Sequence, residues 1–69
     1  MINNEEKVDI INFKLDFWKE RLLESNQAIP VLNDLGNQFK IDSNLQDIIK
    51  YTEIIALLEQ EKETLTNQD

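Results

Sequence analysis

The sequence predicts an all-α fold, an antiparallel helical hairpin that is completed as a bundle by dimerisation. Two long stretches carry apolar residues at spacings of three and four, the period of a helix that buries one face. The chain holds one glycine and one proline, so few positions interrupt helical backbone. Its 69 residues make one domain at most, so we expect a single helical domain over residues 1–69.

The first long helix is predicted over residues 4–26. Asn3, followed by Glu6 three residues later, resembles the pair of side chains that caps a helix start. Acidic side chains at this end also complement the positive end of the helix dipole. The polar run at residues 25–27 is expected to weaken the helix, because such side chains compete for backbone hydrogen bonds.

This first helix carries two apolar stripes on almost opposite sides. One stripe consists of Val8, Ile11, Leu15, Trp18 and Leu22, and the other of Ile10, Phe13 and Phe17. One stripe is enough to pack a helix against its own chain, whereas two stripes need two neighbours. Because so short a chain has few segments to offer, the second stripe favours a partner. The alternative is that it packs against the connector or the second long helix.

The connector is expected to contain a short helix over residues 30–39. Pro30 suits the first turn of a helix, where its missing N–H group costs nothing. Three apolar residues then share one face, namely Leu32, Leu35 and Phe39. Gly36 lies within this segment, where glycine costs about 1 kcal/mol relative to alanine. It marks a kink, a helix end or the close approach of a neighbouring helix.

The second long helix is predicted over residues 44–65, where Ser43 and Gln46 form a capping box. A three-four rhythm then runs through Ile48, Tyr51, Ile55, Leu58, Lys62 and Leu65. Further apolar residues, including Ile54 and Leu57, widen the apolar arc beyond the ~100° of an ordinary surface helix. This helix should therefore be flanked on more than one side.

Charge favours antiparallel pairing of the two long helices. Lys7, Lys14 and Arg21 repeat every seven residues along one edge of the first helix, and residues 41–69 are strongly acidic. A basic edge facing an acidic helix is favourable, although each exposed pair contributes only ~0–1 kcal/mol. The alternative is that the basic row lies in water.

Composition argues against an enzyme. The chain has no cysteine and no histidine, which removes thiolate and imidazole chemistry in catalysis and in metal binding. It has no glycine-rich loop that would cradle phosphate, and its carboxylates fall where a solvated helix face would place them. We therefore expect no catalytic residues, no metal and no cofactor.

The net charge of −7 argues against nucleic acid and anionic lipid as partners. No stretch approaches the ~20 apolar residues that span a bilayer, so we expect no membrane insertion. The polar, acidic start of the chain lacks the features of a secretory signal. A cytoplasmic location is therefore expected.

These inferences favour a non-enzymatic protein–protein interaction module, a homodimer that also binds another protein of unknown identity. The expected interface residues are Ile10, Phe13, Phe17, Ile54 and Leu57. Lys14, Arg21 and Glu53 would adjust orientation at the rim. The alternative is an acidic inhibitor of a basic or nucleic-acid-binding protein, such as a mobile-element inhibitor, an antitoxin or an immunity protein.

Overall fold

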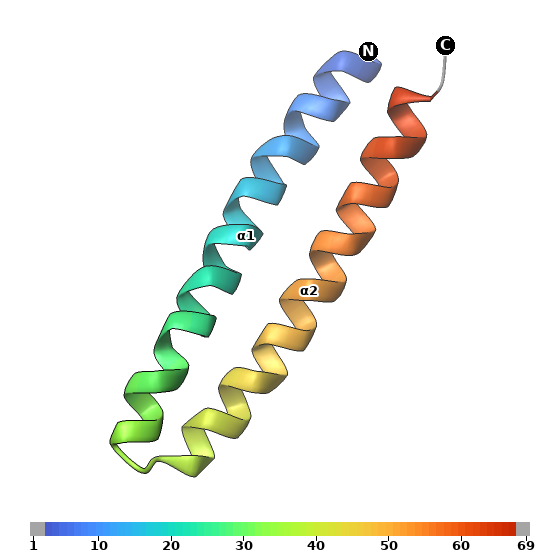
Figure 1. The fold of residues 1–69 in the computed structure, drawn as a ribbon. Coiled ribbons are helices and arrows are strands. Elements are labelled where there is room, and N and C mark those ends of the chain that lie inside the picture. Colours follow the sequence, from blue (N-terminus) through green and yellow to red (C-terminus); the bar gives the residue numbers. More distant parts are fainter. Residues whose placement is uncertain (1–2, 68–69) are drawn as a thin grey trace.

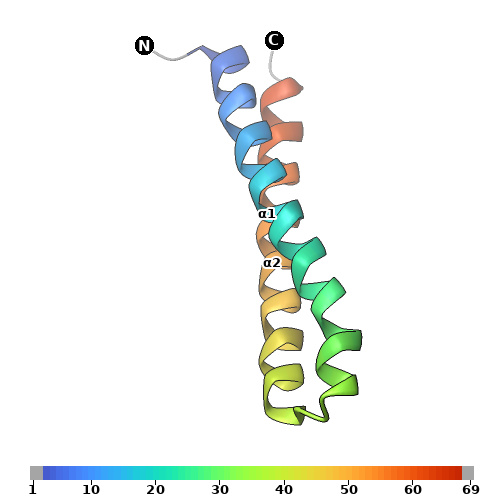
Figure 2. The same cartoon turned by 90° about the vertical axis from the view of Figure 1, so that its left-hand side faces the viewer.

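The computed structural model describes residues 3–67 as two long antiparallel helices joined by a tight turn (Figure 1). Helix α1 spans Asn4–Asp34 and helix α2 spans Gln38–Thr66. The two helices lie side by side, and in the second view they wind past one another rather than running straight (Figure 2). The molecule is a rod with Cα extents of 52 × 16 × 14 Å. The predicted all-α hairpin of two packed helices is confirmed.

Each helix begins at an asparagine whose side chain caps it. The side chain of Asn3 accepts a hydrogen bond from the backbone N–H of Glu6 at 2.8 Å, as the sequence predicts. The side chain of Asn37 accepts one from the backbone N–H of Lys40 at 3.2 Å. Each bond satisfies one of the four backbone donors that a helix start leaves without an intrahelical partner.

The turn is built on Gly36, which ends α1. Gly36 has a φ of 68°, a left-handed conformation that suits glycine because it has no Cβ. Its N–H donates to the carbonyl of Asn33 at 3.0 Å, and the N–H of Asn37 donates to the carbonyl of Leu32 at 3.1 Å. This pair of bonds is the Schellman arrangement that terminates helices. Of the three roles open to Gly36, the helix end is the one found.

The expected short helix over residues 30–39 is not a separate element. Residues 30–34 continue α1, residues 35–37 form the turn, and residues 38–39 already belong to α2. Pro30 therefore lies inside α1 instead of beginning a helix. Its missing N–H would have bonded to the carbonyl of Asn26, and both residues are exposed. At an exposed position water can bond to a carbonyl that lacks its helical partner, which lowers the cost of proline there.

The second helix also begins earlier than predicted, at Gln38 rather than near residue 44. Ser43 and Gln46 consequently lie inside α2 and do not cap it. Asn37, placed directly after the turn glycine, supplies the cap first. The polar run at 25–27 does not interrupt α1 either. Packing along the length of α2 outweighs the weak local preference of these residues.

The residues at which the two helices pack together, which we call the seam, follow a continuous heptad pattern. Only Ile11, Leu15 and Ile41 are buried among the described hydrophobic residues, at 4%, 4% and 7% exposure. The positions at alternating spacings of three and four are buried or half-buried throughout: Val8, Ile11, Leu15, Trp18, Leu22, Ser25, Ile29 and Leu32 on α1, and Ile41, Asn44, Ile48, Tyr51, Ile55, Leu58, Lys62 and Leu65 on α2. Such a repeat keeps one stripe of each helix facing its partner, as in a coiled coil.

Two contacts fix the register of the seam. The rings of Trp18 and Tyr51 lie 5.5 Å apart between their centroids. Closer to the turn, the side-chain amide of Asn44 donates to the backbone carbonyl of Ser25 at 2.7 Å. The helices run in opposite directions, so each step toward the N-terminus of α1 matches a step toward the C-terminus of α2. This register decides which residues outside the seam share a surface.

We expect Gly36→Ala to destabilise the hairpin by about 1–2 kcal/mol, because an L-residue is strained in the left-handed region. No atom lies within 4 Å of where the new Cβ would be, so the loss is conformational rather than steric. Gly36→Asn is the matched control and should lose less, since asparagine tolerates this conformation. Urea unfolding at one fixed protein concentration measures both. An alanine variant as stable as the parent would contradict this account of the turn.

We expect Leu15→Ala to cost roughly 2–5 kcal/mol, because it leaves a cavity in the seam. Leu57→Ala makes the same change at a side chain that is 65% exposed, and in dilute solution it should cost less than about 0.5 kcal/mol. Thermal unfolding followed by circular dichroism at low concentration compares the two. Equal losses would show that the seam is not where the structure places it.

Candidate interaction surface

The second apolar stripe of α1 is not covered by the described chain. Ile10, Phe13 and Phe17 are 45%, 76% and 49% exposed. Helix α2 buries the first stripe of α1, and the connector, which was the alternative cover for the second stripe, is absorbed into the two helices. The three exposed side chains lie in the half of α1 that is distant from the turn.

The register places Ile54 and Leu57 at the same level as this stripe. Tyr51 meets Trp18, and Glu61 and Leu65 border the segment of α1 from Lys7 to Lys14, so Ile54 and Leu57 lie between these two levels. Leu57 is exposed and Ile54 is half-buried. The two helices thus bring the five predicted residues to one stretch of the rod.

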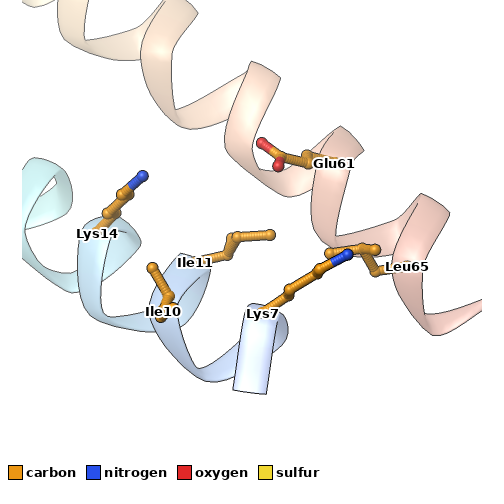
Figure 3. A pocket seen from close by; sticks show the side chains of 6 residues that line it. All are labelled: Lys7, Ile10, Ile11, Lys14, Glu61 and Leu65. Carbon is orange, nitrogen blue, oxygen red and sulfur yellow. The ribbon is translucent and has the colours of Figure 1, made fainter. Parts of the chain in front are cut away.

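A pocket of about 290 Å³ places the stripe of Ile10 and the stripe of Glu61 on one side of the molecule. It is lined by Lys7, Ile10, Ile11 and Lys14 from α1 and by Glu61 and Leu65 from α2 (Figure 3). Phe17 follows Ile10 by seven residues and so lies on the same stripe of α1. Ile54 and Leu57 precede Glu61 by seven and four residues and lie on the same stripe of α2. Phe13 lies at the outer edge of this side, between Ile10 and Phe17.

We call this side the basic flank. It comprises the two stripes that border the pocket and their continuation toward the turn. Its charged residues are five bases, Lys7, Lys14, Arg21, Lys40 and Lys50, and three acids, Glu24, Asp47 and Glu61. Its apolar patch is made by Ile10, Phe17, Ile54 and Leu57, with Phe13 at the edge. An apolar centre within a charged rim is the composition of a protein interface.

The opposite side is the acidic flank, marked by the ion pair between Lys19 and Glu59 at 3.4 Å. With 3.6 residues per turn, Lys19 lies about 140° around α1 from Lys14, and Glu59 lies about 160° around α2 from Glu61. The ion pair is therefore on the side of the rod away from the pocket. The charged residues on the stripes through this pair are six acids, Glu5, Asp9, Asp16, Asp42, Glu59 and Glu63, and one base, Lys19. Charge is thus divided unevenly between the two sides of the rod.

Phe17 is held in place by aromatic neighbours. Its ring meets the ring of Trp18 edge to face, with centroids 5.1 Å apart. The guanidinium of Arg21 lies over the Phe17 ring, 5.8 Å from its centroid. These contacts fix a half-exposed aromatic side chain before any partner arrives. A pre-positioned aromatic loses little conformational entropy on binding, and aromatic and arginine residues are enriched at interface hot spots.

The basic row does not pair with α2. Within residues 3–67, Lys19–Glu59 is the only ion pair, and Lys7, Lys14 and Arg21 take no part in one. Lys7 and Lys14 instead border the pocket beside Glu61 (Figure 3). Glu53, the third residue expected at the rim, is exposed on α2. The row therefore remains accessible to charges on another molecule.

One apolar feature was not predicted as part of a site. Leu23, Leu45 and Ile49 are exposed on the acidic flank, at one level of the rod. On α1, Leu23 follows Lys19 by four residues, which keeps it on the side of Lys19. On α2, Leu45 and Ile49 precede Glu59 by fourteen and ten residues, which keeps them on the side of Glu59. The sequence shows that these three residues are apolar, but their proximity follows only once the alignment of the two helices is known.

The described residues hold no group of three acidic, histidine or cysteine side chains that would bind a metal ion. Over residues 3–67, neither helix combines the length and the apolarity that crossing a membrane requires. Comparison with protein-family models, curated proteins and solved structures finds no match to this chain. The surface geometry is therefore the basis for the functional proposal.

Proposed function

We propose that this chain is a non-enzymatic interaction module of the cytoplasm that binds a second copy of itself and another protein. The observation that carries the proposal is the apolar patch of the basic flank. Ile10 and Phe17 from α1, with Phe13 at the edge, are exposed on the side where α2 carries the exposed Leu57 and the half-buried Ile54. Binding buries these side chains, and each large apolar side chain removed from water contributes roughly 1.5–3 kcal/mol.

The shape of the molecule supports self-association. The chain exposes 5470 Å², whereas a compact monomer of 8.2 kDa would expose about 4,500 Å². The excess is close to the ~800 Å² that each partner buries in a standard interface. Small domains often gain stability from disulfides, metals or association. This chain has no cysteine, and residues 3–67 hold no cluster that would bind a metal ion, which favours association. A second copy would supply the buried area that one hairpin lacks.

A second candidate keeps the fold and changes the partner. The acidic flank, with six acids and one base, favours docking on a basic protein surface, as an inhibitor or immunity-type protein would do. In that case the chain alone would remain a single copy. Its complex would weaken steeply as salt rises, because exposed charges are screened over about 10 Å at 0.1 M. A dimer held by apolar burial would change little over the same range.

We expect Phe13→Glu to abolish self-association, because it places a charge in the apolar contact. Glutamate is a good helix former, so helicity measured at high concentration should be largely retained. Sedimentation velocity at high micromolar concentration gives the mass of the assembly. Leu57→Glu tests the same surface from α2 and should have the same effect.

Phe39→Glu is the matched control for Phe13→Glu. Phe39 is 83% exposed in the first turn of α2, at the turn end of the rod and far from the patch. An acid there complements the helix dipole, so this variant should assemble like the parent. The proposal fails if Phe13→Glu and Leu57→Glu both sediment like the parent. It fails also if Phe39→Glu disrupts assembly as strongly as they do.

A further inference from the structure

We propose that the apolar patch of the basic flank is received by the acidic flank of a second copy. The contact would then join two different surfaces of the same chain. This inference rests on the proposed function, because it names the surface that covers the patch. The observations that carry it are the apolar centre of the acidic flank, the charges of the two flanks and the dimensions of the rod.

The acidic flank has an apolar centre of its own. Leu23, Leu45 and Ile49 are exposed there, and Ala56 extends the same stripe of α2 toward Glu59. Leu23, Leu45 and Ile49 are 55%, 46% and 60% exposed, so the described chain leaves about half of each residue in water. The hairpin therefore presents two apolar patches, one on each side of the rod. Covering only one of them would leave the other in water.

The charges of the two flanks are complementary. The basic flank carries five bases and three acids, and the acidic flank carries six acids and one base. Pairing unlike flanks sets Lys7, Lys14 and Arg21 against the acid-rich side of the neighbour. Pairing basic flank with basic flank would bring the two rows of bases together instead. Complementary potential speeds association and selects the arrangement, while like charges placed together are costly.

The flanks are large enough for a stable contact. One long side of a rod with Cα extents of 52 × 16 × 14 Å offers about the 800 Å² that each partner of a standard interface buries. Two hairpins stacked in this way form a four-helix arrangement in which the basic-flank patch of one copy and the acidic-flank patch of the other are inside.

Such a contact is heterologous, so each pair of copies keeps one free basic flank and one free acidic flank. A heterologous contact continues into a ring or an open chain unless something occupies the free surfaces. We therefore expect the parent protein to grow beyond two copies as concentration rises. The free flanks are also where a different protein with matching charge would bind.

The test mixes two variants, each with one flank blocked. Leu57→Glu blocks the basic flank, and Ile49→Glu blocks the acidic flank at a side chain that is also exposed. Each variant alone should sediment as a single chain at high micromolar concentration. Their equimolar mixture should form a complex of two copies that grows no further, since each variant contributes its one intact flank. The matched control mixes Leu57→Glu with Phe17→Glu, both blocked on the basic flank, and should stay single.

Other outcomes overturn this arrangement and identify which proposal fails. If Ile49→Glu alone still forms dimers, the basic flanks pair with each other, and self-association survives while the heterologous contact is wrong. If Leu57→Glu alone forms dimers, the acidic flanks pair and the heterologous contact is again wrong. If both variants stay single and the mixture does too, unlike flanks do not meet. A parent chain that stays single in the same runs would remove the proposed self-association itself.

Discussion

The structure depends on one geometric constraint, which is that a single helix can cover only one side of another. In this hairpin α2 covers the stripe of α1 that runs through Ile11 and Leu15, and α1 covers the matching stripe of α2. Both helices are apolar over a wider arc than that. The surplus lies on two flanks, and the seam buries only three of the described hydrophobic side chains fully. The small number of buried side chains and the exposed apolar surface therefore have the same cause.

The helical hairpin could be predicted from spacing because the apolar repeat is long and unbroken. The cap at Asn3 could also be predicted, since it needs only side chains that are close in the sequence. The structure of the connector could not be predicted from such local patterns. Pro30 and the capping box at Ser43 are local signals for helix starts, but no helix begins at either residue. The second helix begins instead after Gly36, where Asn37 caps it. Which of several competing signals prevails depends on packing along the whole partner helix.

The candidate surface was predictable in part. The exposed stripe of Ile10, Phe13 and Phe17 follows from one helix alone, because its two stripes lie on nearly opposite sides. That Ile54 and Leu57 join it requires the register between helices, which Trp18 and Tyr51 supply. The division of charge between flanks and the second patch at Leu45 and Ile49 require the same register. The extent of a surface that two helices form together cannot be predicted from the pattern of each helix taken separately.

The central claim is that Ile10, Phe13 and Phe17 are covered by another molecule rather than by their own chain. The most direct measurement is an isotope-filtered NMR experiment on an equal mixture of labelled and unlabelled protein at high concentration. Our account predicts contacts between the rings of Phe13 or Phe17 in one copy and apolar side chains of another. A fully helical protein that shows no contacts between copies from these rings would contradict it.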